Sequence, residues 1–161
     1  QRKISGAKVC TFSLQYCVER SCKTHEPSLV PELLITDIES SINFWCTLCD
    51  FSIQYERREE GFAYLVSGNT HIMLEQRGFS RNWITGDLDV PYGRGINFQI
   101  SIESVDLIVN RLQQQKWPLY MDPEEKWYQK GDREVGVRQF LVQDPDGYLL
   151  RFSEHLGERS L

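Results

Sequence analysis

Side chains that could carry out chemistry are sparse in this sequence of 161 residues. Of its three histidines, His25 lies in the N-terminal segment and His155 lies near the C-terminus. No Ser-His-Asp or Cys-His arrangement can be argued from this set, so nucleophilic catalysis is not supported. More informative is the run Tyr-Leu-Leu-Arg-Phe after the turn Asp-Pro-Asp-Gly, because it places the guanidinium of Arg151 among the apolar neighbours of a strand.

The five cysteines are an odd number and cannot all pair within one chain. Cys46 and Cys49 form a single Cys-x-x-Cys, and no second ligand pair follows at the spacing that a zinc site needs. A thioredoxin-like pair would stand at the start of a helix, whereas this one lies near the end of a predicted helix. We therefore interpret both as structural thiols, one of them packed inward, and expect a reducing, cytoplasmic setting.

Charge is unevenly distributed along the chain. The formal net charge is −5, but residues 1–27 hold five Lys or Arg against two Glu, a local +3, so the remainder carries −8. A body this acidic repels phosphates, which argues against nucleic acid as a partner and suits a cationic or neutral ligand. No run approaches the 18 apolar residues of a membrane-spanning helix, so no membrane partner is expected.

Residues 1–27 are interpreted as an N-terminal appendage that is loosely attached to a single domain at 28–161. The stretch VCTFSLQYCV (9–18) faintly resembles the apolar part of a signal peptide. Ser13 and Gln15 interrupt it, however, and no small-residue cleavage site is clear, so we do not interpret it as a signal.

Hydrophobic periodicity predicts the order strand-helix-strand-strand-strand twice. The first set of strands is expected at 30–36, 51–58, 62–67 and 70–76, with a helix after Asp37 that continues to Cys49. A polar loop at 77–95 follows, and the second set is expected at 96–102, 117–126 (a strand piece or a loop), 133–143 and 147–155, with a helix after Ser104.

An offset of 67 residues relates the two halves, since it takes Asp37 to Ser104 and Ile42 to Val109. The caps and the core positions therefore coincide, which indicates a duplication with modules at about 28–76 and 96–155. The predicted fold is α+β: two tandem β-α-β-β-β modules form curved mixed sheets around a concave cleft, with the helices on the convex side.

Two stretches carry a family resemblance, VPELLITDIESSINFW (30–45) and RQFLVQDPDGYLLRF (138–152). Together they resemble the first strand and helix and the closing hairpin of the vicinal oxygen chelate superfamily, which includes glyoxalase I, extradiol dioxygenases, fosfomycin-resistance enzymes and bleomycin resistance proteins. The resemblance covers roughly residues 29–155 and is strongest to the bleomycin resistance proteins.

Enzymes of that superfamily hold a divalent metal with His and Glu ligands, and the resemblance places these positions at Val30, Met73, Asn97 and Arg151. Valine has no lone pair to offer, and an arginine stays protonated and cannot coordinate a cation. The resemblance therefore implies neither metal nor cofactor here. Bleomycin resistance proteins also lack the metal ligands, and they act by binding.

Residues two apart on a strand share a face, which assigns a ligand set to the concave side. Aromatic rings there would stack on a planar heterocycle, and carboxylates would attract a cationic group. Two alternatives stay open: Phe62 and Tyr64 as ordinary sheet residues, and Glu32 paired with Arg151 as a structural ion pair. The predicted ligand set is Glu32, Tyr55, Phe62, Tyr64, His71, Met73, Glu75, Asn97, Gln99 and Arg151, with Trp83 at the rim or in a dimer contact.

The sequence thus predicts a metal-independent, non-catalytic protein that sequesters a planar, cationic small molecule. The resemblance implies a homodimer with two clefts shared between subunits. One alternative is an enzyme of the same fold (a lyase, isomerase or dioxygenase-like protein) acting on a small metabolite through general acid or base groups such as Glu75 or His71. Another is an interaction module whose concave face grips a peptide.

Overall fold

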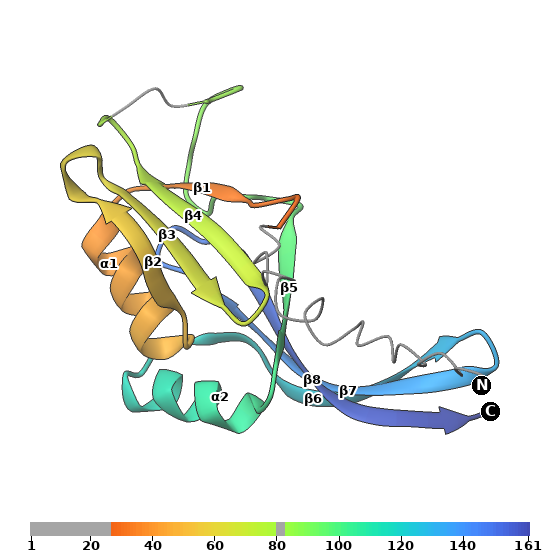
Figure 1. Ribbon diagram of the computed structural model, residues 1–161. Coiled ribbons are helices and arrows are strands. Elements are labelled where there is room, and N and C mark those ends of the chain that lie inside the picture. Colours follow the sequence, from red (N-terminus) through yellow and green to blue (C-terminus); the bar gives the residue numbers. More distant parts are fainter. Residues whose placement is uncertain (1–26, 80–82) are drawn as a thin grey trace, which may run out of the picture.

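The computed structural model describes residues 27–79 and 83–161, which form two modules with a four-stranded sheet each (Figure 1). The first module consists of β1 (Glu32–Ile35), α1 (Ile38–Ile42), η1 (Asn43–Leu48), β2 (Ser52–Arg57), η2 (Arg58–Glu60), β3 (Phe62–Ser67) and β4 (Thr70–Gln76). The second consists of β5 (Asn97–Ile102), α2 (Val105–Gln114), β6 (Leu119–Lys130), β7 (Arg133–Gln143) and β8 (Leu149–Ser160). None of the helices in these residues is long and apolar enough to cross a membrane.

Both sheets have the same strand order, β1-β4-β3-β2 in the first and β5-β8-β7-β6 in the second. In each module the first strand runs parallel to the last one, so that Glu32 pairs with Met73 and Asn97 pairs with Leu149. The other strand pairs are antiparallel. The predicted duplication and the α+β fold class are therefore confirmed.

Each helix begins at the predicted residue, but the two starts are stabilised differently. The carboxylate of Asp37 accepts a hydrogen bond from the amide of Ser40 at 2.7 Å, which is ordinary N-capping. The side chain of Ser104 makes no such bond, and the carboxylate of Glu154 on β8 accepts from the amide of Val105 at 2.8 Å instead. A backbone N–H at the start of this helix, which has no partner within the helix, is thus hydrogen-bonded by a side chain from strand β8.

The first helix does not continue in one register as predicted. The α-helical part ends at Ile42, and η1 continues as a π-helix. The wider turn changes which residues point inward, so Phe44 and Leu48 are fully buried while Ile38 and Ile42 are only partly buried.

One hydrophobic cluster joins the two modules, and residues of both helices take part in it. The two helices lie next to each other (Figure 1). The ring of Phe44 on η1 lies 4.9 Å from the ring of Trp117, which follows α2. Sheet residues of the cluster alternate along their strands, so the residues between them lie on the opposite side of each sheet, which we call its open face. The sheet residues of the cluster are Leu33, Ile35, Ala63, Leu65, Ile72, Leu74, Ile100, Phe140, Val142, Leu150 and Phe152.

The turn Asp-Pro-Asp-Gly at 144–147 fastens the second module to the end of β1. Both carboxylate oxygens of Asp146 lie within 3.2 Å of the amide of Thr36, and the hydroxyl of Tyr148 donates to the carbonyl of Leu34 at 3.0 Å. Gly147 has φ +91°, and a Cβ added there would lie 2.6 Å from the backbone Cα of Pro91. Only glycine fits this turn without a rearrangement.

Two of the last three strands are longer than the sequence predicted, whereas β7 has the predicted bounds. The segment 117–126, expected as a strand piece or a loop, belongs to β6, which extends to Lys130, and β8 extends to Ser160 rather than ending at 155. Their far ends project from the body as a three-stranded ribbon (Figure 1). Trp127 stabilises this ribbon, because it packs against Gly136 and lies 4.1 Å under the guanidinium of Arg159.

Cys46 and Cys49 are free thiols, as predicted, and Cys49 is the one that packs inward. Burial raises the pKa of the Cys49 thiol well above its usual range, which keeps it protonated and unreactive. The other three cysteines, the expected appendage and the rejected signal segment lie outside the described residues.

Candidate functional site

The open face of the first sheet brings most of the predicted ligand set together. One row across the sheet runs from Glu32 on β1 through Met73 and Tyr64 to Tyr55 on β2. The next row runs through Leu34, Glu75, Phe62 and Arg57. The alternation of the four strands therefore places these side chains on one face, as expected from their spacing.

The ring of Tyr55 stacks on those of Phe62 and Tyr64 on this face, and we call these three residues the aromatic platform. The ring of Tyr55 lies 5.0 Å from that of Tyr64 and 5.9 Å from that of Phe62, with interplanar angles of 20° and 28°. Tyr55 is 47% exposed, whereas Phe62 is only 6% exposed. The platform thus presents an accessible ring at Tyr55 and a covered one at Phe62.

Arg57 covers Phe62, and sequence analysis did not select this residue. Its guanidinium carbon lies 3.8 Å from the centroid of the Phe62 ring, and its Nε donates to Glu60 at 2.5 Å. That hydrogen bond raises the pKa of Arg57, so the group stays charged. The signal was available, because Arg57 stands two residues after Tyr55 on one strand and therefore shares its face.

Carboxylates and one imidazole surround the platform. Glu75 lies directly beside Phe62 on the neighbouring strand, and Glu32 lies beside Met73 at the edge of the sheet. The Nδ1 atom of His71 is 3.1 Å from the hydroxyl oxygen of Tyr64, so these two side chains are hydrogen-bonded. The face therefore combines stacked rings with negative charge.

The remaining predicted residues lie on the open face of the second sheet. Gln99 and Arg151 are cross-strand neighbours, and Arg151 donates a short hydrogen bond to the side-chain oxygen of Gln99. Asn97 stands two residues before Gln99 on β5 and is exposed. The suggested ion pair between Glu32 and Arg151 is wrong, because the two residues belong to different sheets and Arg151 uses Gln99 instead.

A second polar cluster on this sheet escaped the sequence analysis. The amide nitrogen of Gln139 donates to Glu124 at 2.8 Å and to the hydroxyl of Tyr128 at 3.0 Å. It was missed because 117–126 was not recognised as one continuous strand with the residues after it. Trp83, in the loop between the modules, is 77% exposed, which agrees with its predicted surface position.

The four positions at which the resemblance would place metal ligands do not suit a metal. Val30 and Met73 offer no oxygen or nitrogen, and the guanidinium of Arg151 is a donor engaged with Gln99. Within 27–79 and 83–161, no group of three or more His, Cys, Asp or Glu is placed so that it could hold an ion. The donor chemistry therefore does not fit the metal centre of the superfamily's enzymes.

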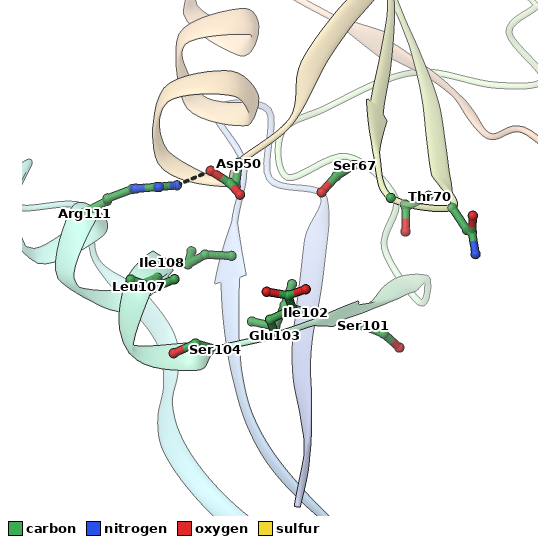
Figure 2. A pocket seen from close by; sticks show the side chains of 12 residues that line it. Asp50, Ser67, Thr70, Ser101, Ile102, Glu103, Ser104, Leu107, Ile108 and Arg111 are labelled. Carbon is green, nitrogen blue, oxygen red and sulfur yellow. Dashed lines mark hydrogen bonds and ion pairs between the residues drawn. The ribbon is translucent and has the colours of Figure 1, made fainter.

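Two cavities of the described chain lie away from the ligand set. One, of about 580 Å³, opens between the modules and is bordered by Ser67, Thr70, Glu103 and the ion pair of Arg111 with Asp50 at 2.7 Å (Figure 2). The other, of about 680 Å³, is bordered by Val90, Trp117, Tyr120 and Gln143 among others. Neither includes a predicted ligand residue. The platform is open to solvent at Tyr55, which is 47% exposed.

The paired β-α-β-β-β modules, each with one open sheet face, define a class of protein built by duplication of this unit. A family model described as "Glyoxalase/Bleomycin resistance protein/Dioxygenase superfamily" matches residues 29–152. The chain belongs to this superfamily, as the two end motifs had indicated.

Similarity to individual proteins agrees with that assignment. The chain is 25% identical over 140 residues to a bleomycin resistance protein from Geobacillus stearothermophilus, covering 79% of this chain and 96% of that one. Among solved structures, TioX from Micromonospora sp. ML1 aligns with a TM-score of 0.60 at 21% identity, over 80% of this chain and 98% of that one. The virulence protein STM3117 from Salmonella typhimurium aligns with a TM-score of 0.58 at 19% identity, over 79% and 94% of the two chains. The two structures show the shared fold.

Proposed function

We propose that this protein binds and sequesters a planar, cationic small molecule on the aromatic platform, without a metal and without chemical conversion. The observation that supports it is the stack of Tyr55, Phe62 and Tyr64 on an open sheet face, in the same rows as Glu32 and Glu75. Stacked rings offer a flat, apolar surface to a heterocycle. Carboxylates beside them favour a positive charge on it.

The similarity to bleomycin resistance proteins supports the same proposal, because their name describes protection against a drug. Metal-dependent chemistry is disfavoured by the donor set at Val30, Met73, Asn97 and Arg151. An enzyme of the same fold would need another catalytic group, and His71 is already hydrogen-bonded to Tyr64. Binding is therefore the function that these residues support best.

We further propose that two copies associate, with the open face of the first sheet of one copy against that of the second sheet of the other. An open platform leaves a bound ligand in contact with water, whereas a facing sheet would enclose it. Arg151 on the second face offers a positive charge to Glu32 and Glu75 on the first. Light scattering should give twice the chain mass. Arg151→Glu should weaken the dimer, while Arg133→Glu at the tip of the ribbon should leave it intact.

A thermal-shift screen with bleomycin and planar cations such as proflavine and ethidium tests the ligand class. We expect at least one to raise the melting temperature, because a ligand that binds only the folded state stabilises it by mass action. For the best compound, calorimetry should show weaker binding to Tyr55→Leu and to Glu75→Gln, by about tenfold each. Tyr120→Leu, which removes an exposed tyrosine of the second sheet, is the matched control.

The same experiment discriminates the alternatives. Added salt should reduce the difference between the unaltered chain and Glu75→Gln, because salt screens charges at an open surface. The compound should be recovered chemically unchanged after prolonged incubation, since a converted product would identify an enzyme. If Tyr55→Leu and Glu75→Gln both bind like the unaltered chain, the ligand does not occupy the platform.

A further inference from the structure

We propose that Arg57 is an internal competitor for the aromatic platform. Its guanidinium occupies the position on Phe62 that the planar cationic group of the ligand takes, and the ligand binds there by displacing it. This inference rests on the function proposed above and adds a residue that sets both the affinity and the kind of ligand.

The arrangement of Arg57 is that of a bound planar cation. Its guanidinium carbon is 3.8 Å from the centroid of the Phe62 ring, within the range of a direct cation–π contact. Guanidinium is itself flat and delocalised, so it stacks on a ring as a heteroaromatic cation does. Phe62 is buried although it lies on an open face, and Arg57 supplies cover on one side while Tyr55 stacks from another.

The contact is of a kind that a ligand can displace. Arg57 is anchored through an ion pair with Glu60, three residues away on the short turn that joins β2 to β3, and both side chains are about half exposed. Exposed ion pairs contribute little to stability, and an exposed cation–π contact contributes only modestly. The side chain can therefore leave both the ring and Glu60 at a modest cost.

Departure of Arg57 would leave Phe62 between two carboxylates. Glu75 lies beside Phe62 on β4, and Glu60 follows β2 on the other side. A ligand cation on the ring would thus replace one positive charge by another in the same electrostatic surroundings. A neutral ligand would displace the positive charge of Arg57 without replacing it, which would leave the carboxylates of Glu60 and Glu75 without a cation on the ring. Arg57 therefore selects for cationic ligands.

Arg58 provides a matched control one residue further along. Its Nε pairs with Glu56 at 2.8 Å and a terminal nitrogen lies 3.4 Å from Glu39, so it is also an exposed arginine held by carboxylates. It does not lie over a platform ring. Arg57→Ala and Arg58→Ala remove the same charge from nearly the same place, and any difference between them reports on the contact with Phe62.

The test measures binding of proflavine, a fluorescent planar cation, to the full chain and to both variants. We expect Arg57→Ala to bind about fivefold more tightly than the unaltered chain, the factor that corresponds to one exposed cation–π contact. Arg58→Ala should bind with unchanged affinity. In nuclear magnetic resonance spectra, the δ-methylene protons of Arg57 should carry a ring-current shift from Phe62, and saturation with proflavine should abolish it.

Several outcomes would overturn the proposal. If Arg57→Ala binds no more tightly than Arg58→Ala, Arg57 does not compete, and if it binds more weakly, Arg57 contacts the ligand instead. Both results would leave the proposed function intact, provided that Tyr55→Leu weakens proflavine binding. If Tyr55→Leu has no effect, or if proflavine, ethidium and bleomycin all fail to bind, the platform is not the site for planar cations and both proposals fail together.

Discussion

Asp144 should make the free energy of unfolding fall as the pH rises from 4 to 7. This carboxyl group, at the start of the Asp-Pro-Asp-Gly turn, is 3% exposed and lies beside the equally buried Asp146. One of its oxygens accepts from the amides of Asp146 and Tyr148 at 3.0 and 2.9 Å, and the other lies 3.4 Å from the indole nitrogen of Trp45. Burial outweighs these hydrogen bonds and raises the pKa of Asp144 from 3.8 to about 7.

The sign and size of the effect follow from that shift. Below pH 4 the group is protonated in both the folded and the unfolded chain, and it contributes no pH dependence. Between pH 4 and 7 the unfolded chain has released its proton while the folded chain keeps it, so each pH unit costs up to about 1.4 kcal/mol. A shift of roughly three units therefore corresponds to a loss of about 4 kcal/mol across this interval.

Urea unfolding of the unaltered chain and of Asp144→Asn at several pH values between 4 and 8 measures the effect. We expect the asparagine variant to lose less stability over this range, because it has no proton to release. The side-chain amide of the new asparagine will face the indole N–H of Trp45, so the variant should be less stable at pH 4 than the unaltered chain. Asp106→Asn is the control: the hydrogen bond from Arg138 lowers the pKa of Asp106, so that group titrates below the range. Parallel stability curves for the unaltered chain and Asp144→Asn would refute the assignment of a raised pKa to this residue.

Further predictions concern the turn, the metal and the N-terminal segment. Gly147→Ala should destabilise the protein by about 2 kcal/mol or more, because the added Cβ meets the backbone of Pro91 and the left-handed conformation itself costs about 1 kcal/mol. Thermal unfolding measures the loss of stability, and Gly68→Ala, where the space around the added Cβ is open, is the control. Purified protein should contain no stoichiometric divalent metal, and chelator should leave its melting temperature unchanged; about one zinc, nickel, manganese or iron per chain by elemental analysis would contradict this. Deletion of residues 1–27 should preserve a single cooperative unfolding transition, since the buried cluster runs from Leu33 to Phe152. An insoluble truncation would show that the segment contributes to the fold.

Short strands with strict alternation were predictable, and so were the starts of both helices. The strands at 62–67 and 70–76 have the predicted bounds, because two tight turns delimit apolar residues at every second position. The strand β6 was not predictable, since Pro123 and five charged residues in a strand of twelve resemble a loop. Only its pairing with β7 on one side shows that the segment is an edge strand. The π-helical turn at 43–48 also left no signal, because it changes the spacing on which helix prediction rests.

For the candidate site, alternation was enough to place side chains on a face, but it did not show which rings are accessible. Phe62 and Tyr55 are equivalent in the sequence argument, yet Arg57 covers the first and leaves the second exposed. The direction that a long arginine side chain takes depends on its partners, here Glu60 and the ring itself. The same limit explains the error at Arg151, whose partner is a glutamine on its own sheet.

The fastening of β1 by the C-terminal turn has a consequence during protein synthesis. Asp146 and Tyr148 follow their partners Thr36 and Leu34 by 110 and 114 residues. At about 5–20 residues per second, the ribosome synthesises Asp146 and Tyr148 roughly 5–20 s after their partners Thr36 and Leu34. For that interval the outer edge of β1 has polar backbone groups that nothing from the turn can yet pair. We therefore expect the nascent chain to be most prone to edge-to-edge association, and to capture by chaperones, until nearly the whole second module has emerged.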